Sequence, residues 1–441
     1  IVQGAKAEPF DSLTYFSWPM AGQLLDQRAG PVLKSRLNQP FPLFAPAQGL
    51  FMKSCAKCLI PETAEATTFD ETGTCSVCNQ IEFKEEGVDW GDRARQLDEL
   101  IAAFKGKGLY DCIVPFSGGK DSTYQLWYIV TKLNMKPLVV RFDHGFYRPT
   151  LEENNKRTFK KLGVDVVQFT PSWHVVRELM LESLKRRGDF CWHCHTGIYA
   201  HTMQMALRYE TPLLFWGESL AEYQSFYTYE EMEEVDEKRF NRAMNLGMTA
   251  DDMYEFLQGR VTKRDLYPFA YPPRKELRKL GCRSVCLGNY IKWDTKNQVE
   301  IIKRELDWQG DRVEGIPPEF DYEKIECHMQ GIRDYLKYIK RGFGRTNHLA
   351  NIEIRNGRMT RERGEVLEKQ YDGKRPPSLD IFLEYLHMSE EEFLEAAMSH
   401  QVDPHRFQPN QVQGGERMPD MDQWDRTEVP WPNRPSIKIG G

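Results

Sequence analysis

The stretch that decides the fold is Ile113–Ser122, which reads IVPFSGGKDS. Its apolar first half is typical of a buried strand, and the two glycines after Ser117 allow a tight turn. Beyond Asp121 the apolar residues recur at helical spacing. A strand, a glycine turn and a helix start gather backbone N–H groups around one point. The stretch therefore predicts an anion-binding site.

The side chains of this turn suit a phosphate. Lys120 adds a full positive charge, and Ser117 and Ser122 add hydroxyl donors. The spacing differs from that of the Walker loop, and SGGKDS instead resembles the pyrophosphate loop (PP-loop) of the ATP pyrophosphatase superfamily. Enzymes of that superfamily split ATP between its α and β phosphates and transfer AMP to a carbonyl or carboxyl oxygen. By this resemblance, the residues expected to bind ATP are Pro115, Phe116, Ser117, Gly118, Gly119, Lys120, Asp121 and Ser122.

The composition is that of an ordinary globular chain. Its 441 residues are 40% hydrophobic and 28% charged, enough for two or three domains. A formal net charge of −6 argues against a general binder of nucleic acids, although local basic patches are still allowed. The sequence contains no run of about 18 apolar residues and no secretory signal, so we expect a cytoplasmic protein without a membrane span.

Eight of the ten cysteines form four close pairs, which indicates metal binding in a reducing compartment rather than disulfide bonds. Sixteen residues separate the first two pairs, Cys55/Cys58 and Cys75/Cys78. This spacing matches the four-cysteine zinc pattern, in which two knuckles complete a tetrahedral thiolate shell. We expect a small zinc ribbon with a structural metal, because four cysteines leave no coordination position open for water.

Strands and helices alternate after the PP-loop, which predicts an α/β fold with a doubly wound parallel sheet. The expected strands span 137–143, 164–169 and 212–216, and the expected helices span 151–162, 173–187 and 196–209. Ligands of such sheets bind beyond the carboxyl ends of the strands, where the sequence places Asp143 and Glu218. We expect Asp143 either to contact the nucleotide or to cap a turn. Glu218 is expected to bind Mg²⁺ or substrate, or to cap a turn.

A second group of soft ligands is the octapeptide GDFCWHCH at Gly188–His195. It contains Cys191 and Cys194, and the pair Cys282 and Cys286 follows later in the chain. Thiolates and imidazoles bind zinc and iron. The first pair with one later cysteine could hold an iron–sulfur cluster or a second zinc. Alternatively, these residues are packed thiols without a metal.

The chain is expected to divide into five parts. They are a leader arm (1–51), the zinc ribbon (52–88), the PP-loop domain (89–295) with a helical insertion at about 224–281, a C-terminal helical region (296–403) and an extended tail (404–441). The leader is expected to matter little for catalysis. Later helices are predicted over 295–308, 322–340, 361–371 and 379–400, the last a pair joined by the capping box Ser389-x-x-Glu392.

Taken together, the motifs resemble the bacterial N-acetyl sugar amidotransferases, which make acetamidino sugars for O-antigens of lipopolysaccharide and for flagellin glycans. The motifs are Met52-Lys53-x-Cys55-x-x-Cys58, the loop Ser117–Ser122, the octapeptide Gly188–His195, Trp216–Glu218 and Lys340–Arg345. The resemblance covers about residues 52–400 and implies an adenine nucleotide alpha-hydrolase-like fold. It also implies a ligase-type reaction, in which AMP is transferred to the amide oxygen of an N-acetylated sugar and ammonia then displaces it.

The resemblance assigns catalysis to the loop and to one later carboxylate. Backbone N–H groups and the lysine would hold the departing pyrophosphate, the serines would orient it, and the carboxylates would place Mg²⁺. The residues expected in these roles are Ser117, Lys120, Asp121 and Glu218.

The implied substrate is an N-acetylated sugar, by preference a diacetamido sugar, either free or nucleotide-linked. The sequence contains no glutaminase nucleophile elbow, so we expect ammonia from separate glutaminase and synthase-like subunits. The competing interpretation is a PP-loop tRNA-thiolating enzyme, whose cluster is held by a Cys-x-x-Cys pair and a third cysteine. Cys191 and Cys194 with Cys282 or Cys286 fit that layout, whereas the net negative charge speaks against a nucleic-acid partner.

Overall fold

The structure is a computed structural model that describes residues 52–222, 228–230, 232, 234 and 237–407. The chain divides into two units, Ile1–Leu50 and Phe51–Gly441, and all described residues belong to the second. The leader expected at 1–51, part of the insertion and the tail from residue 408 onward thus lie almost entirely outside the described residues.

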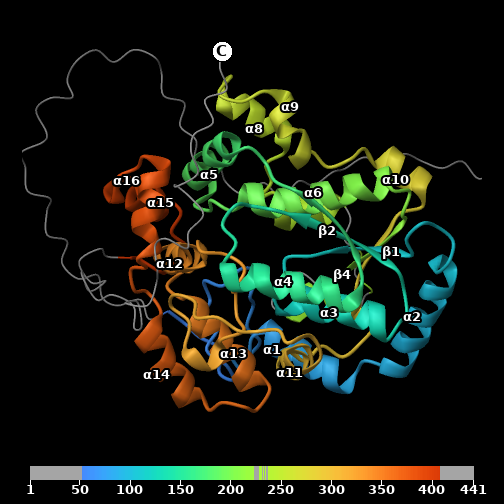
Figure 1. Ribbon diagram of the computed structural model, residues 1–441. Coiled ribbons are helices and arrows are strands. Elements are labelled where there is room, and N and C mark those ends of the chain that lie inside the picture. The colour runs from blue at the N-terminus through green and yellow to red at the C-terminus, as the bar shows by residue number, and fades with distance from the viewer. Residues whose placement is uncertain (1–51, 223–227, 231, 233, 235–236, 408–441) are drawn as a thin grey trace, which may run out of the picture. The chain divides into compact units, whose positions relative to one another are not determined.

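A five-stranded parallel sheet with strand order β3-β2-β1-β4-β5 organises this unit (Figure 1). Its strands are β1 (Cys112–Pro115), β2 (Pro137–Phe142), β3 (Asp165–Phe169), β4 (Leu213–Trp216) and β5 (Arg283–Cys286). Ile113 pairs with Leu138 on one side and with Leu214 on the other. The chain order therefore reverses at β1. Parallel α/β sheets bind ligands at such a switch point, beyond the carboxyl ends of the strands.

Helices cover both faces of the sheet (Figure 1). On one face α6 (Trp192–Arg208) packs against β1 and β2. On the other face α3 (Lys120–Thr131) packs against β1, α4 (Pro149–Leu162) and α11 (Thr295–Leu306). β1, β2 and β4 are buried along their whole length, as expected of parallel strands covered on both sides. The predicted α/β class with a parallel sheet is confirmed.

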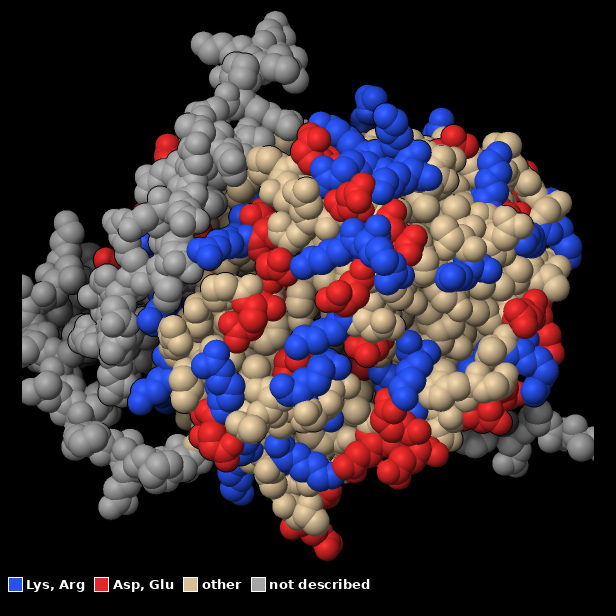
Figure 2. All heavy atoms as spheres, turned by 60° about the horizontal axis from the view of Figure 1, so that its bottom comes forward, with Lys and Arg blue, Asp and Glu red and all other residues tan. Residues whose placement is uncertain are grey.

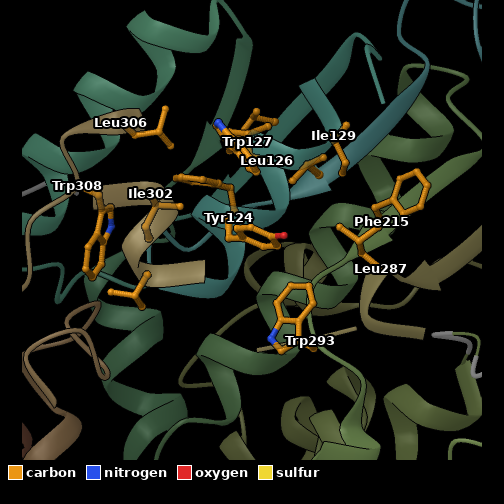
Figure 3. Packing of buried hydrophobic residues seen from close by; sticks show 14 of the residues in the cluster. Tyr124, Leu126, Trp127, Ile129, Phe215, Leu287, Trp293, Ile302, Leu306 and Trp308 are labelled. Carbon is orange, nitrogen blue, oxygen red and sulfur yellow. The ribbon is translucent and has the colours of Figure 1, made fainter. Parts of the chain in front are cut away.

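Aromatic and aliphatic side chains together form the core between α3, α11 and the sheet (Figure 3). Tyr124 and Trp127 of α3 lie in this core with Ile302 of α11 and with Trp308, which follows α11. Trp308 is only 2% exposed, and its indole N–H donates to the carbonyl oxygen of Gly118 at 3.3 Å. The apolar core therefore extends to the PP-loop and fixes the backbone of the turn from behind.

The remaining helices flank the sheet. Before and within it lie α1 (Ser76–Glu86), α2 (Trp90–Phe104) and α5 (Trp173–Arg187). The insertion contains α7 (Glu237–Arg239), α8 (Ala250–Leu257), α9 (Lys263–Leu266) and α10 (Arg274–Leu280). The C-terminal region contains α12 (Gln330–Arg341), α13 (Arg345–Arg355), α14 (Arg361–Tyr371), α15 (Ser378–Leu386) and α16 (Glu390–Met398), the last with the expected capping box. The boundaries proposed for the domains stay predictions.

A second apolar cluster attaches the C-terminal helices to the sheet layer. Met180 of α5 packs there with Ile332 of α12, Phe382 of α15 and Phe393 of α16, and Figure 1 shows these helices side by side. Within the described part of the chain, none of the helices combines the length and the apolar character that crossing a membrane requires.

One predicted helix is wrong in its first half. The sequence pattern favours a single helix over 322–340, but α12 begins at Gln330. Residues 321–329, which we call the strap, instead form a run of turns after a short 3-10 helix at Pro318–Phe320. Ile325 of the strap is fully buried, and the His328 N–H donates to Phe146 O at 2.9 Å. Tertiary contacts thus override the local helical spacing.

The buried carboxyl group of Glu314 makes the stability of this C-terminal packing depend on pH. Ser378 donates to it from its backbone N–H at 3.2 Å and from its hydroxyl at 2.5 Å. Burial raises the pKa of Glu314 from 4.5 to about 7, although both hydrogen bonds oppose the rise. A raised acid pKa favours folding most at low pH, and the contribution is lost as the pH rises through the pKa of the folded state.

We therefore expect the difference in stability between wild type and Glu314→Gln to shift in favour of the variant between pH 5 and pH 8. The shift should reach about 3 kcal/mol, because one pKa unit corresponds to about 1.4 kcal/mol. Melting temperatures of both proteins across this pH range measure it. A stability difference that does not change with pH would contradict the assignment.

Candidate functional site

The PP-loop connects the end of β1 to the start of α3, at the switch point of the sheet. Gly118 has φ +92°, in the region that glycine tolerates best, and Gly119 is the N-cap of α3. A Cβ on Gly118 would lie 2.2 Å from Asn155 Oδ1, and one on Gly119 would lie 2.0 Å from Glu326 Oε1. Gly118 is therefore favoured by its conformation, whereas a side chain at Gly119 would require Glu326 to move.

The loop directs its N–H groups toward its own serine hydroxyls. The Gly118 N–H donates to Ser122 Oγ at 3.0 Å, and the Gly119 N–H donates to Ser117 Oγ at 3.3 Å. The two hydroxyl oxygens are 3.2 Å apart. Two backbone donors and two hydroxyls thus converge at the N-terminus of α3, where the helix dipole also favours negative charge. This arrangement is suited to a phosphate group.

Lys120 is buried and held by carboxylates. Its Nζ lies 2.8 Å from Asp121 Oδ2 and 2.9 Å from Glu323 Oε2 of the strap. Burial alone would lower the pKa of Lys120, but these carboxylates raise it well above its ordinary value. Burial would raise the pKa of Glu323, yet Lys120 and neighbouring cations hold it at about 2. Both groups are therefore charged, and a fixed positive charge stands at the base of the loop.

Two carboxylates near the loop fit a magnesium ion. Asp121 Oδ1 is buried and has no hydrogen-bond partner among the described residues, and Glu218 follows the end of β4. Mg²⁺ is usually bound by one or two carboxylates together with phosphate oxygens and water. Asp121 and Glu218 both line one cavity with the loop, so the donor set suits an ion bound jointly with a triphosphate.

A cavity of about 320 Å³ opens beyond the carboxyl ends of β1, β2 and β4. Its lining includes the PP-loop, the end of β2 with His144, the octapeptide and the first turns of α6, the end of β4, Arg239 of the insertion, and the strap with the start of α12. Its chemically active lining comprises Ser117, Asp121, Ser122, His144, Cys191, Cys194, His195, Glu218, Arg239, Lys324, Glu326, Cys327, Gln330 and Arg333. Lys120 lines a second, smaller cavity of about 150 Å³, which shares Glu218 and Lys324 with the first.

The octapeptide is held by its aromatic residues. Phe190 is buried among the C-terminal helices, and Trp192 is fully buried on the other side, with its indole N–H donating to Met248 O at 3.0 Å. These opposite anchors leave Cys191 and Cys194 on the cavity wall. His193 and His195 are neutral at pH 7, because burial lowers the pKa of each imidazole to about 3.

The structure separates the two pairs of this second cysteine group. Cys286 is buried at the end of β5 beside Trp216, and Cys282 packs beneath the sheet layer. Neither of them lines the cavity, whereas Cys327 of the strap does. A single cysteine in a segment without a spacing pattern gave no signal in the sequence, so Cys327 was missed. The strap's Glu323, Lys324 and Glu326 were missed for the same reason.

Asp143 caps a turn, which is one of the two roles that the sequence left open. Its Oδ1 accepts from the Gly145 N–H at 2.8 Å, and its Oδ2 accepts from the Thr170 hydroxyl at 3.0 Å. The residues around it, Phe142 and His144, line the cavity, but Asp143 does not. A contact between Asp143 and the nucleotide stays a prediction.

The four N-terminal cysteines form a separate metal-type centre. Cys55, Cys58, Cys75 and Cys78 are buried, and their sulfur atoms all lie within 4.8 Å of one another. The Cys55–Cys78 and Cys58–Cys75 separations are 3.9 and 3.8 Å. A tetrahedral ion with Zn–S bonds of about 2.3 Å needs sulfur atoms about 3.8 Å apart. The predicted cysteine cluster is confirmed, and its spacing suits a single ion such as zinc.

This centre docks on the C-terminal helices. The Leu59 N–H donates to Asn351 Oδ1 of α13 at 2.5 Å, and Arg361 of α14 donates to the backbone carbonyls of Cys55 and Cys58. Phe343, between α12 and α13, completes the small apolar cluster around the cysteines. The cysteine ribbon therefore supports the C-terminal region that carries the strap. The two are far apart in the sequence.

One comparison with known families matches the C-terminal part of the chain. Residues 315–419 match the family described as "LPS biosynthesis protein WbpG-like, C-terminal domain". The matched segment contains the strap and α12, which form one wall of the cavity. The match supports a role in the biosynthesis of surface sugars.

Two individual proteins are similar over limited ranges. "Uncharacterized protein MJ1599" of Methanocaldococcus jannaschii is 29% identical over 101 residues, which are 23% of this chain and 35% of that protein. The chain thus spans about a third of the length of this relative. A solved structure, described as "U34-tRNA thiolase NcsA from Methanococcus maripaludis with its [4Fe-4S] cluster", aligns with 81% of this chain and 100% of its own at 12% identity. Its TM-score of 0.24 is too low to support any conclusion about fold or function.

We expect Cys78→Ser to lose about one zinc per chain and to destabilise the protein by on the order of 5 kcal/mol, because the ribbon relies on the metal for its fold. Elemental analysis and the melting temperature measure the two effects. Cys282→Ser, at a cysteine outside the cluster, is the matched control and should keep both the zinc and the melting temperature. Retention of full zinc by Cys78→Ser would contradict the assignment.

Proposed function

We propose that this protein is an ATP-dependent amidotransferase that converts the acetamido group of an N-acetylated sugar into an acetamidino group. The observation that carries the proposal is the PP-loop, because its residues Ser117, Asp121 and Ser122 line one cavity with the segment matched by the LPS-biosynthesis family. An anion cradle at a switch point suits a nucleotide. The family match supplies the sugar side of the reaction.

The chemistry follows from the low reactivity of amides. In the first step the amide oxygen attacks the α-phosphorus of ATP, the bond to the β-phosphate oxygen breaks, and pyrophosphate leaves. In the second step ammonia adds to the activated carbon, and the carbon–oxygen bond breaks to release AMP. The AMP carries away the amide oxygen, and the sugar keeps the ammonia nitrogen as an amidinium group. Adenylylation thus turns a poor leaving group into a good one.

The loop residues suit the first step. The N–H groups of Gly118 and Gly119 and the Lys120 ammonium would stabilise the charge that develops on pyrophosphate. The hydroxyls of Ser117 and Ser122, which now accept from these N–H groups, would turn to donate to phosphate oxygens. Asp121 and Glu218 would hold Mg²⁺, which neutralises phosphate charge.

The nitrogen source is a second part of the proposal. The proposal assigns adenylylation to the loop residues above, and the resemblance to the sugar amidotransferases assigns ammonia release to separate glutaminase and synthase-like subunits. Free ammonia at high concentration should replace these subunits in the test tube. Because the unprotonated form attacks the activated carbon, the ammonia-dependent rate should rise with pH toward the pKa of ammonium.

The second candidate is a tRNA-thiolating enzyme, favoured by the presence of Cys191, Cys194 and Cys327 on the cavity wall. A tRNA partner requires a basic surface. On the face shown in Figure 2, acidic side chains are interspersed with the basic ones, and the chain carries a net charge of −6. We therefore prefer a small sugar substrate.

The two candidates differ in their products. The protein is incubated with ATP, Mg²⁺, ammonium and a panel of diacetamido sugars, free and nucleotide-linked, and in parallel with tRNA. We expect one sugar to change its mass by the replacement of O with NH, together with formation of AMP and pyrophosphate. AMP formation that depends on tRNA and on no sugar would overturn the proposal in favour of the second candidate.

We expect Lys120→Ala to lower the rate of sugar-dependent AMP formation by about a thousandfold, because it removes the charge that faces the departing pyrophosphate. Since this change leaves two buried carboxylates without their partner, Ser122→Ala is a milder second variant, with an expected loss of about tenfold to a hundredfold. Zinc content and melting temperature report whether each variant is folded.

Lys132→Ala is the matched control for these variants. Lys132 is the exposed residue at the other end of α3, so its removal should leave the rate of AMP formation unchanged. If folded Lys120→Ala and Ser122→Ala proteins form AMP as fast as the control, the loop does not bind the pyrophosphate and the proposed function is wrong.

A further inference from the structure

Three cysteines from two distant segments share one wall of the nucleotide cavity. Cys191 and Cys194 belong to the start of α6, and Cys327 belongs to the strap. All three are free thiols, and they lie near enough to interact electrostatically with one another. The amidation chemistry proposed above uses none of them. Their convergence therefore needs another explanation.

The helix start presents the first pair as a knuckle. Cys191 is the N-cap residue of the 17-residue helix α6, and Cys194 lies in its first turn. The Cys191 N–H donates to Asp189 Oδ1 at 2.8 Å, and the buried rings of Phe190 and Trp192 fix the turn on both sides. The unpaired N–H groups of a helix start stabilise negative charge, so this position lowers the cost of holding thiolates.

The backbone donates a hydrogen bond to Cys327 Sγ in the same way as to Cys55 Sγ of the N-terminal cluster. The Met329 N–H donates to Cys327 Sγ at 3.3 Å. In the N-terminal cluster, the Lys57 N–H donates to Cys55 Sγ at 3.4 Å, again from the second residue after the cysteine. The backbone at Cys327 is thus arranged like the backbone of a metal knuckle.

Charges of both signs surround the three sulfurs: the carboxylates of Asp189 and Glu326, and the guanidinium group of Arg333, which acts on all three. Burial raises the pKa of all three thiols, and the positive charge of Arg333 opposes that rise at each of them. Arg333 lines the same cavity and lies 3.8 Å from Asp189, which holds it beside the sulfurs. A cationic side chain and a helix start both favour a ligand that bears net negative charge.

The three sulfurs are spaced more widely than those of the N-terminal cluster. Among the residues that the structure describes, the four N-terminal cysteines are the one group of possible ligands whose atoms all lie within 4.8 Å. At least one pair among Cys191, Cys194 and Cys327 is therefore farther apart than 4.8 Å, whereas a tetrahedral zinc site needs about 3.8 Å. A cluster of several metal ions is larger than a single ion, so the cysteine thiolates that bind it lie farther apart.

We infer that Cys191, Cys194 and Cys327 ligate an iron–sulfur cluster on the wall of the nucleotide cavity. Cysteine thiolates are the ligands that such clusters prefer. Three thiolates leave one iron of a four-iron cluster without a cysteine, and this position would face the cavity. The inference replaces Cys282 and Cys286 by Cys327 as the partner of the first pair. It is independent of the proposed function, since the cluster can be present whether or not the protein makes amidines.

The test is the iron and sulfide content of the full chain, purified without oxygen and reconstituted with ferrous iron and sulfide. We expect about four iron and four acid-labile sulfide per chain, with visible charge-transfer absorption and an electron paramagnetic resonance signal after reduction. Cys327→Ser, and separately Cys194→Ser, should lose most of the iron and the signal. Both should keep the zinc of the N-terminal cluster, which shows that the variants are folded.

Cys282→Ser is the matched control, because Cys282 is a partly buried cysteine that does not line the cavity. It should keep the full iron content. Three outcomes would overturn the inference: no stable iron in the reconstituted wild type, equal iron in Cys327→Ser and wild type, or loss of iron in Cys282→Ser. A disulfide between any two of the three cysteines in protein kept free of oxygen would also contradict it.

Discussion

The buried ion pair between Lys120 and Glu323 joins the two halves of the site. Lys120 belongs to the PP-loop and Glu323 to the strap, and their charged atoms are 2.9 Å apart with both side chains almost fully buried. Removing two charges from water is costly unless each has a close partner, so this pair favours the contact between the two halves. The pair thereby sets the position of the strap against the sheet, and with it the far wall of the cavity.

The same contact connects the four-cysteine ribbon to the site. Arg345, the first residue of α13, lies 3.6 Å from Glu323 and 3.2 Å from Asp334 of α12. The ribbon holds α13 through Leu59, whose backbone binds Asn347 and Asn351. A chain of hydrogen bonds and ion pairs thus runs from the cysteine cluster through α13 to the lysine of the loop. Through these contacts, a metal bound at the cysteine cluster would support the wall of the cavity.

Features set by neighbouring residues could be predicted from the sequence, and features set by distant ones could not. The PP-loop and the cysteine pairs at Cys55 and Cys75 depend on short spacings, and the parallel sheet depends on local alternation. The strap depends on Ile325, Glu323 and His328 finding partners almost two hundred residues earlier, which no local pattern encodes. The helical spacing after residue 322 was therefore misleading.

The cysteines of the cavity illustrate the same limit. Cys191 and Cys194 could be singled out because they are close together in a turn rich in soft ligands. Their companion could not, because a lone cysteine carries no spacing, and the sequence favoured the paired Cys282 and Cys286 instead. The fold selects Cys327, since the strap crosses the carboxyl edge of the sheet beside α6.

The central claim is that the oxygen of a sugar acetamido group attacks the α-phosphorus of ATP held by the PP-loop. The most direct measurement uses a sugar substrate whose acetamido oxygen is a heavy isotope, with ATP, Mg²⁺ and ammonium. The account predicts that the heavy oxygen appears in the phosphate of AMP, in one-to-one proportion to the amidine formed. AMP without the label would mean that water or another nucleophile opens the nucleotide, and would contradict the account.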